Sequence, residues 1–409
     1  MVDIAALIAA RAIIVLFQPI VSLRRAQIVG YEALARGFGP SGPIPPLVLF
    51  DAARRQGLEL DLDRLCRELA LRAFVSSRLD GVLFLNVDSS ALRPGVVGSS
   101  WIRDKVAEFG LDAASIVLEI AETHVLDTQH LYDFVDRYRD AGFLIALDDF
   151  GAAHSNLDRL VRIEPDIIKV DRGLIQSVHQ VAAKGLLVRS LADMCRRLGA
   201  LGLAEGVEEE DEALVLAHAG FDLFQGYYFG RPALAFPEED CNTSRIVRHL
   251  GQQFEGYRRK QLVLATKRSR QLYQRAHEYA EALRRCSPQE FDNVLQCFIQ
   301  KAWDVDCLFV TDAQGVQVSQ TICQPGHAPR GGVLFRKAEP GTDHGLKDYI
   351  AVPRRLDRPT YLSPRYVSYA TRILCRTVSQ EFLAADGRSY FLCVDFIEMP
   401  LEEADSPEE

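Results

Sequence analysis

The sequence lacks three features, and each absence removes a class of protein. None of its nine cysteines belongs to a CxxC pair, and an odd number of scattered cysteines predicts reduced thiols. Basic residues are not in excess: the net charge is −9, which argues against binding along a nucleic-acid backbone. No apolar run is long enough to span a membrane. We therefore expect a cytoplasmic protein that binds neither nucleic acid nor a membrane.

The first residues also lack a targeting signal. The apolar stretch 4–17 is interrupted by Arg11, is too short to cross a bilayer, and follows Asp3 rather than a basic segment. With 409 residues, 48% of them hydrophobic and 25% charged, the chain has the size and composition of a globular protein with two domains.

Short apolar runs recur through the first part of the chain, and each is followed by a polar residue. The runs are 13–17, 28–31, 82–85, 116–118, 144–147, 167–168, 201–204 and 221–224, and the polar residues are Gln18, Glu32, Asn86, Glu119, Asp148, Lys169, Glu205 and Gln225. Helical patterns lie between most runs, which predicts parallel strands with right-handed crossovers. Eight such units fit an α/β fold of the TIM-like (β/α)8 type, which takes about 250 residues. A doubly wound open sheet is the alternative, but it would not gather eight strand ends at one mouth.

The run 144–147 ends in two adjacent carboxylates, Asp148 and Asp149. Neighbouring carboxylates repel each other more strongly as water is excluded, and a bound cation relieves that repulsion. The alternative is a helix N-cap followed by a solvated acid, because Asp is a good cap.

The other strand ends favour the cation. In a barrel, Glu32, Asn86, Glu119, Lys169 and Glu205 would share one mouth with the two aspartates, and one lysine cannot compensate five acids. Oxygen ligands of this kind suit Mg²⁺ or Mn²⁺, and two ions bridged by a carboxylate commonly serve displacement at phosphorus. The pattern therefore predicts metal-assisted phosphodiester hydrolysis.

Eight segments, read in order, resemble the motifs of the EAL domain family of cyclic-di-GMP phosphodiesterases. They are 17–20 (FQPI), 30–36 (GYEALAR), 85–86 (LN), 119–122 (EIAE), 148–151 (DDFG), 168–171 (IKVD), 204–208 (AEGVE) and 225–232 (QGYYFGRP). Each motif alone is weakly specific, but eight in this order identify the chain as a member of the family.

The resemblance implies a barrel with one antiparallel strand and two Mg²⁺ or Mn²⁺ ions. It implies that one ion is held by Glu32, Asn86, Glu119 and Asp148, and the other by Asp148 and Asp149. Lys169 and Glu205 would orient or deprotonate the attacking water, with Gln225 close by. Gln18, Leu34 and Arg36 would contact cyclic-di-GMP, and Glu122 and Glu208 would anchor loops. The product would be linear pGpG.

Simpler interpretations of some of these residues remain open. Arg36 could be a surface ion-pair partner, and Glu122 and Glu208 could be ordinary exposed acids. One departure from the family also matters. The family loop after DDFG usually reads TGYSSL, but this chain has Ala153 where the glycine stands. If that position requires a positive φ, an alanine there is strained. A non-catalytic cyclic-di-GMP receptor is therefore the alternative to an enzyme, and a barrel acting on another phosphoester is the third hypothesis.

The rest of the chain predicts a connector and a second domain. Residues 242–286 contain no proline and have apolar residues at helical spacing, so they form either a solvated helical connector or a signalling helix that pairs in a homodimer. Two hairpins are expected in the second domain, one across residues 312–315 and one across 384–387. The hairpin at 312–315 and the stretch from 362–366 (LSPRY) through Asp386 and Gly387 resemble PAS or Cache-like sensory domains, which implies regulation by an unknown small-molecule signal. The expected limits are 1–241 for the barrel, 242–286 for the connector, 287–400 for the sensory domain and 401–409 for an acidic tail.

Overall fold

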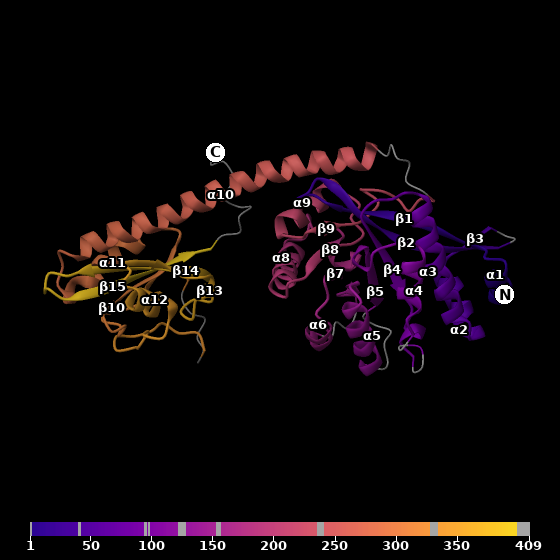
Figure 1. Ribbon diagram of the computed structural model, residues 1–409. Coiled ribbons are helices and arrows are strands. Elements are labelled where there is room, and N and C mark those ends of the chain that lie inside the picture. Colours follow the sequence, from indigo (N-terminus) through magenta and orange to yellow (C-terminus); the bar gives the residue numbers. More distant parts are fainter. Residues whose placement is uncertain are drawn as a thin grey trace. The chain divides into compact units, whose positions relative to one another are not determined.

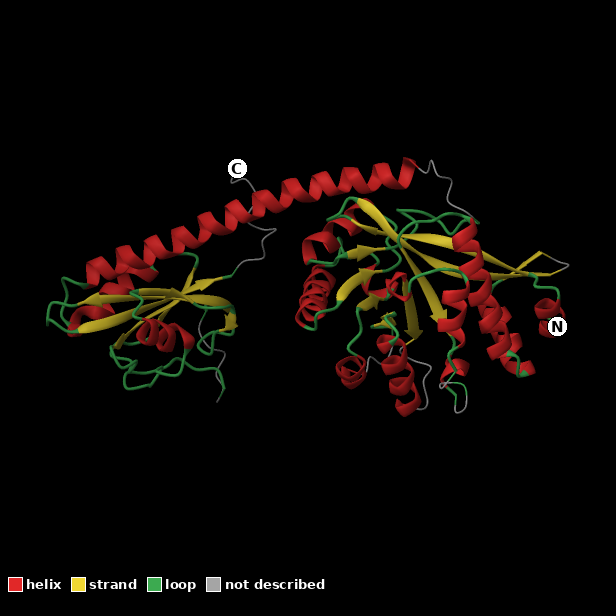
Figure 2. Cartoon of the chain, in the orientation of Figure 1, coloured by secondary structure: helices red, strands yellow, loops and turns green. Residues whose placement is uncertain are grey.

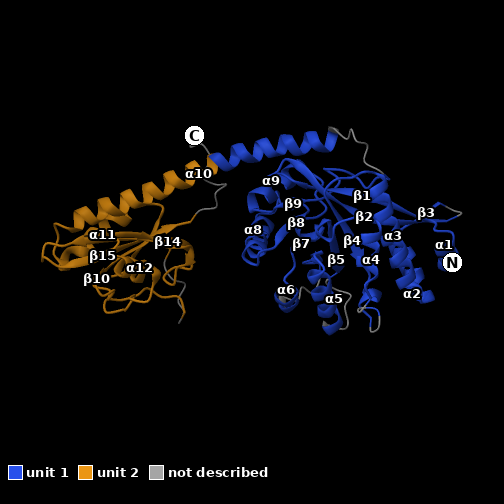
Figure 3. Cartoon of the chain, viewed as in Figure 1, with its two compact units in different colours: residues 1–259 blue, residues 260–409 orange. Residues whose placement is uncertain are grey.

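The chain contains two compact units, residues 1–259 and 260–409 (Figure 3). The boundary falls inside the long helix α10 (Cys241–Leu283). Each unit has its own β-sheet, as Figures 1 and 2 show. The computed structural model describes residues 2–39, 42–93, 96, 99–121, 128–152, 157–234, 241–327 and 334–398. None of the helices in these ranges combines the length and apolarity that crossing a bilayer requires.

The first unit is a closed barrel of eight strands within the described ranges. Around the barrel the order is β1-β9-β8-β7-β6-β5-β4-β2, and β2 pairs with β1 to close it. Strand β1 is antiparallel to both neighbours, and the remaining neighbours are parallel. The bounds are β1 (Ile13–Ser22), β2 (Gln27–Gly39), β4 (Val82–Val87), β5 (Ile116–Ala121), β6 (Leu144–Phe150), β7 (Ile167–Val170), β8 (Leu201–Ala204) and β9 (Leu223–Phe224), and β3 (Gly42–Ile44) extends the sheet beside β2. The predicted barrel is confirmed, and the open sheet is excluded.

Helices cover the outside of this barrel (Figure 2). In α5, Leu131, Phe134, Val135 and Tyr138 recur at helical spacing, and all four are buried in the core beneath the helices. The helices are α1 (Ile4–Ala9), α2 (Pro46–Gln56), α3 (Glu59–Ser76), α4 (Trp101–Glu108), α5 (Thr128–Asp140), α6 (Leu157–Ile163), α7 (Arg172–Ile175), α8 (Ala182–Arg197) and α9 (Glu210–Ala219).

A layer of apolar side chains fills the barrel below its mouth. It consists of Ile20, Phe84, Val117, Ala146, Ile167, Leu203 and Leu223, one from each of seven strands. Side chains along a strand alternate between its two faces, so the residue two positions nearer the mouth also points inward. Those residues are Gln18, Asn86, Glu119, Asp148 and Lys169 within their strands, and Glu205 and Gln225 directly after β8 and β9. The alternation that builds the core therefore also places the polar residues.

The start of α10 packs on the first unit through His218 of α9. The His218 ring stacks on Tyr257 of α10 with ring centroids 3.4 Å apart, and Val247 and Leu250 of α10 are fully buried in the same unit. Burial, together with the nearby positive charge of Arg189, lowers the pKa of His218 from 6.5 to about 4.

This lowered pKa predicts that the stability of the first unit depends on pH. Between pH 6.5 and about 4 the unfolded chain binds a proton that the folded chain does not, so stability falls as the pH falls through this window. We expect His218→Phe, which keeps an aromatic ring but does not titrate, to show a smaller loss. Urea unfolding followed by circular dichroism from pH 7.5 to about 4 measures the difference. Equal pH dependence in the two proteins would contradict the prediction.

The second unit is an antiparallel sheet covered by the end of α10 and by shorter helices. The sheet order is β11-β10-β15-β14-β12, with β13 also paired to β14. Leu272, Ala276, Ala280 and Leu283 of α10 are buried against this sheet. The bounds are α11 (Phe291–Ile299), β10 (Val305–Asp312), β11 (Ile322–Cys323), α12 (Asp348–Leu356), β12 (Thr360–Leu362), β13 (Tyr366–Val367), β14 (Leu374–Leu383) and β15 (Ser389–Ile397). The predicted long helix and small sheet are confirmed.

The two predicted hairpins have different outcomes. Strands β14 and β15 pair across residues 384–387 as expected, with Leu383 opposite Ser389. Across residues 312–315 the chain turns, but residues 316–318 form only isolated bridges. The backbone N–H of Val310 donates to the Ser319 hydroxyl at 2.8 Å, and a side chain therefore replaces a strand partner.

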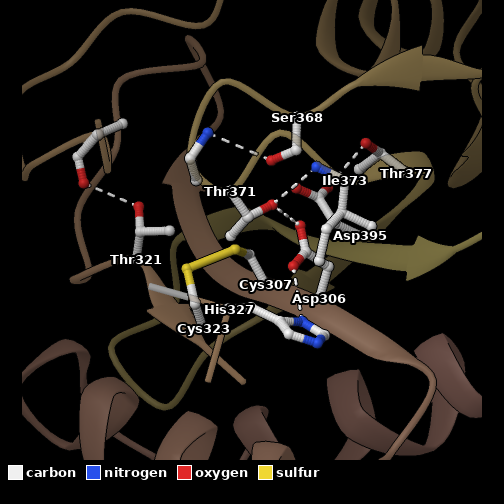
Figure 4. The surroundings of a disulfide bond; sticks show 12 residues. Asp306, Cys307, Thr321, Cys323, His327, Ser368, Thr371, Ile373, Thr377 and Asp395 are labelled. Carbon is white, nitrogen blue, oxygen red and sulfur yellow. Dashed lines mark hydrogen bonds and ion pairs between the residues drawn. A yellow bond between two sulfur atoms is a disulfide. The ribbon is translucent and has the colours of Figure 1, made fainter. Parts of the chain in front are cut away.

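Two of the cysteines form a disulfide, so the prediction of reduced thiols is wrong for this pair. Cys307 of β10 and Cys323 of β11 stand directly opposite each other in the antiparallel register, with Cα atoms 4.1 Å apart (Figure 4). Sixteen positions separate them, and the sequence gives no CxxC-type signal for such a pair. Their pairing depends on the strand register, which the spacing of cysteines does not reveal.

Candidate active site

Lys169 of β7 lies at the centre of the barrel mouth. Its side chain is 1% exposed, and its Nζ lies 2.6 Å from Glu119, 2.7 Å from Glu205, 3.1 Å from Asp148 and 3.9 Å from Glu32. These four acids come from different strands or strand ends, as the predicted convergence requires. A buried lysine is stable only when acids pair with it, and here the pKa of Lys169 is raised well above its usual value despite burial.

The pKa values of the acids around Lys169 are shifted in different directions. Burial would raise the pKa of Glu32, but the charge of Lys169 and hydrogen bonds from Gln225 and Asn86 outweigh burial, and the pKa is lowered. Burial raises the pKa of Glu119 well above 4.5, and the neighbouring Glu32 charge adds to this. Burial also raises the pKa of Glu205, to about 8. One ammonium therefore does not keep all the acids ionised, and the site is short of positive charge.

Asp148 and Asp149 reach the same site although they are neighbours on one strand. Strand β6 continues through Phe150, so neither aspartate is a helix N-cap and that interpretation is wrong. The β6–β7 register shifts between Leu147 and Phe150, and Asp149 has a φ of 56°. Such a bulge re-aims a side chain that would otherwise point to the opposite face. Carboxylate oxygens of Asp148, Asp149 and Glu205 consequently lie within 4.8 Å of one another.

The acids at the mouth have the chemistry of a divalent-cation site. Lys169 Nζ lies 2.6 Å from one carboxylate oxygen of Glu119, and within the described part of the chain the other buried oxygen, Oε2, has no hydrogen-bond partner. Buried oxygens without donors are costly unless a cation compensates them. Carboxylates without thiolates or imidazoles suit Mg²⁺ or Mn²⁺ rather than a softer metal.

Two glutamines and one asparagine fix the orientation of Glu32. Gln225 donates to Glu32 at 2.6 Å and to Gln18 at 3.2 Å, and Gln18 donates to the Gly230 carbonyl at 3.1 Å. Asn86 donates to the other oxygen of Glu32 at 2.9 Å. The predicted residues Gln18, Asn86 and Gln225 therefore all lie around one carboxylate.

Two cavities meet at Glu32. One of about 270 Å³ is lined by Glu32, Asp148, Lys169 and Glu205, and one of about 400 Å³ is lined by Glu32, Asn86, Leu34 and Arg36. The first contains the acids and the second contains the predicted substrate contacts. In the described residues Arg36 makes no ion pair, and its guanidinium donates only to the Ala35 carbonyl, at 2.9 Å. The interpretation of Arg36 as a surface ion-pair partner has no support here.

The sequence reasoning missed Arg172, which also lines the smaller cavity. Its guanidinium lies 3.1 Å from Glu208, so the pair joins the first residue of α7 to the loop after β8. Its position directly after the IKVD segment is a signal that could have drawn attention to it. The pair gives Glu208 a partner that a loop anchor would need. Glu122 and Ala153, by contrast, lie outside the described residues.

Comparisons with known proteins agree with this fold. The model of the EAL domain family matches residues 1–232. YkuI, an uncharacterized EAL-domain containing protein of Bacillus subtilis, is 28% identical over 313 residues, which cover 75% of this chain and 76% of YkuI. The probable cyclic di-GMP phosphodiesterase PdeN of Escherichia coli is 30% identical over 224 residues, or 53% of this chain and 43% of PdeN.

Solved structures show the same fold. The crystal structure of YkuI in complex with cyclic-di-GMP and calcium has a TM-score of 0.78 and 24% identity, and the match covers 98% of this chain and all of that one. A complex of Klebsiella pneumoniae BlrP1 with manganese and cyclic-di-GMP has a TM-score of 0.50 and 31% identity, and covers 54% of this chain and 56% of that one. The fold and the acids at its mouth define a barrel whose mouth carries oxygen ligands of the kind that a divalent cation takes. The chain belongs to the EAL domain family.

Proposed function

We propose that this chain is a phosphodiesterase that hydrolyses cyclic-di-GMP to linear pGpG with the help of divalent cations. The observation that carries the proposal is the group of five acids around one buried lysine, Lys169, at the barrel mouth. Membership of the EAL family supports it, as does the similarity to PdeN and to proteins solved with cyclic-di-GMP.

The cation is Mg²⁺ or Mn²⁺ in this proposal, and two ions are held. Glu32, Asn86, Glu119 and Asp148 would hold one ion, and Asp148 and Asp149 would hold the other. When bound, such ions polarise a phosphate oxygen and lower the pKa of water. Glu119 Oε2, which is buried without a hydrogen-bond partner among the described residues, and the convergence of three acids on one point support this assignment.

The remaining residues bind substrate and move protons. Glu205, whose carboxyl is held by Lys169, accepts a proton from the attacking water, and Gln225 holds Glu32 in place. Water adds to phosphorus, one P–O ester bond breaks, and the leaving oxygen takes up a proton. Arg36, Leu34 and Gln18 contact the dinucleotide, and Glu208 anchors its loop on Arg172.

The test is product analysis. The purified chain is incubated with cyclic-di-GMP and Mg²⁺ or Mn²⁺, and products are separated by liquid chromatography and identified by mass. We expect pGpG to accumulate only when a divalent cation is present. Tight binding of cyclic-di-GMP without product would indicate a receptor, and hydrolysis of other phosphodiesters but not of cyclic-di-GMP would indicate a different substrate. Either result would overturn the proposal.

Arg36→Lys should weaken substrate binding more than it slows the chemical step. A guanidinium forms a two-pronged hydrogen bond with phosphate that an ammonium cannot reproduce, and we expect KM to rise roughly tenfold. Steady-state kinetics measure the change, with Arg54→Lys as a control because Arg54 also lines this cavity but pairs with Asp51. An unchanged KM in Arg36→Lys, or an equal change in both variants, would contradict the assignment.

The proposal also covers the rest of the chain. Residues 287–400 form a PAS-like or Cache-like sensory domain, and this domain regulates the barrel through the connector 242–286. The chain acts in the cytoplasm as a homodimer. The exposed apolar residues Leu262, Val263 and Leu264 on α10 support pairing through this helix. Light scattering at tens of micromolar protein tests the assembly, and a monomer throughout would contradict it.

A further inference from the structure

The second unit contains a cavity of about 750 Å³ with aromatic walls. Phe309, His344, Tyr349 and Tyr366 line it. The rings of Phe309 and His344 stack with centroids 4.9 Å apart, and those of Tyr349 and Tyr366 stack at 6.3 Å. A cavity of this size holds a small organic molecule, and ring faces attract cations.

A buried carboxyl, Asp395 of β15, lies in the wall of the same cavity. It is 4% exposed, and its partners are hydroxyls: Thr377 donates at 2.8 Å and Tyr366 at 3.2 Å. Across the described ranges no lysine, arginine or histidine forms an ion pair with it. Burial raises its pKa to about 7. Among the described residues, this carboxyl lacks the positive partner that buried acids usually have.

A second acid lies close to Asp395 and increases the negative charge there. Asp306, Asp395 and Cys307 each place one atom within 4.8 Å of the other two. Figure 4 shows that Asp306 has its own partners, His327 at 3.2 Å and Thr371 at 2.6 Å. Of these two acids only Asp395 lines the cavity, so Asp395 is the one that a ligand in the cavity reaches.

The histidine in the wall carries no compensating charge. Nε2 of His344 faces Gln317 Oε1 at 2.9 Å, and the Gln317 amide nitrogen donates elsewhere, so Nε2 is the protonated nitrogen. Nδ1 therefore accepts a hydrogen bond from the Tyr349 hydroxyl, at 2.9 Å. Burial lowers the pKa of His344, which keeps the ring neutral. The Tyr349 oxygen is left as an acceptor, which suits an N–H donor.

We propose that this cavity binds a small organic ammonium compound, with the ammonium group on Asp395 between the aromatic rings. A metal ion fits less well, because Cys307 is in a disulfide and cannot act as a thiolate ligand. The exposed cations Arg336 and Lys347 line the cavity as well, and they suit a carboxylate at the other end of the ligand, as in an α-amino acid. The proposal does not depend on the function of the barrel.

The experiment compares matched probes on the full chain by isothermal titration calorimetry at pH 7.5. One set is phenethylamine, phenylalanine and the uncharged isostere 2-phenylethanol; the other is isoamylamine, leucine and isoamyl alcohol. We expect an amine or amino acid to bind with a Kd below about 1 mM, and its alcohol to bind roughly tenfold to 100-fold more weakly. Each amino acid differs from its amine by a carboxylate, so tighter binding of the amino acid would show that Arg336 and Lys347 contribute to the affinity.

Variants locate the site. Asp395→Asn should weaken binding of the ammonium probe roughly tenfold to 100-fold, whereas Glu278→Gln, an exposed acid on α10, and Glu32→Gln, in the barrel, should not. The alcohol comparison uses the unmodified chain, so it stands even if a variant misfolds. The proposal is overturned if no ammonium probe binds, if the alcohols bind equally well, or if Glu32→Gln rather than Asp395→Asn removes binding.

Discussion

Glu32→Gln is expected to lower kcat for cyclic-di-GMP hydrolysis about 1,000-fold or more while the chain stays folded. Glu32 is 8% exposed, and Lys169, Gln225 and Asn86 together keep it ionised. Glutamine keeps the shape of the side chain but removes the negative charge that would bind a cation. The loss of a cation ligand removes several kcal/mol of transition-state stabilisation, which is the basis of the expected factor.

The measurement is steady-state hydrolysis at saturating Mg²⁺, with circular dichroism to confirm folding. Glu68→Gln is the matched control, because Glu68 also forms an ion pair, with Arg11, but on a helix outside the mouth. We expect the control to keep near-normal activity. Near-normal turnover in Glu32→Gln would remove Glu32 from the catalytic site.

Most of this site could be predicted from the sequence because one physical rule places both core and site. Val117 and Glu119 lie two positions apart on β5, as do Ile167 and Lys169 on β7, so an inward apolar residue predicts an inward polar one. In a barrel the strand ends meet at one mouth, and the acids then converge. The contact of Lys169 with four acids from separate segments follows from that rule.

The position of Asp149 does not follow from the alternation of side chains along a strand. Strict alternation would point it away from Asp148, and only the bulge and the positive φ turn it towards the site. The order of motifs in the chain suggested its role, but the strand pattern could not. Arg172 was missed for a similar reason, because its contact with Glu208 depends on how the start of α7 approaches the loop after β8, which no periodicity encodes.

The second unit was less predictable because its site depends on register between distant segments. Asp395 and Tyr366 are far apart in the chain, and the pairing of β13 and β15 with β14 brings them together. Cys307 and Cys323 likewise meet only through the β10–β11 register. Hairpins between neighbouring strands can be predicted from turn residues, but pairing across long connections leaves no local signal.

Lys169→Met is expected to destabilise the metal-free chain by about 3–5 kcal/mol at pH 7.5 and to reduce hydrolysis severely. Methionine fills much the same space but leaves Glu119, Asp148 and Glu205 without their shared cation. Breaking a buried ion pair by removing one partner costs about 3–5 kcal/mol because the remaining charges stay buried. Glu119 and Glu205 should then take up protons, because without Lys169 their folded-state pKa values rise further above the unfolded value of 4.5. The folded variant binds more protons than the unfolded chain, and its stability increases as the pH is lowered from 7.5 towards 5.

Divalent cations should reverse part of this loss, and that reversal separates a charge effect from a packing effect. Urea unfolding with and without Mn²⁺ measures it, and we expect Mn²⁺ to stabilise Lys169→Met more than the unmodified chain, because the ion replaces a missing positive charge. Lys184→Met is the control: Lys184 is half-buried and donates to the carbonyls of Gly173 and Gln176 but pairs with no acid among the described residues, so its loss should have little effect on either quantity. If Lys169→Met were as stable as the unmodified chain without metal, or if Mn²⁺ stabilised both proteins equally, Lys169 would not be the charge that holds the acids together.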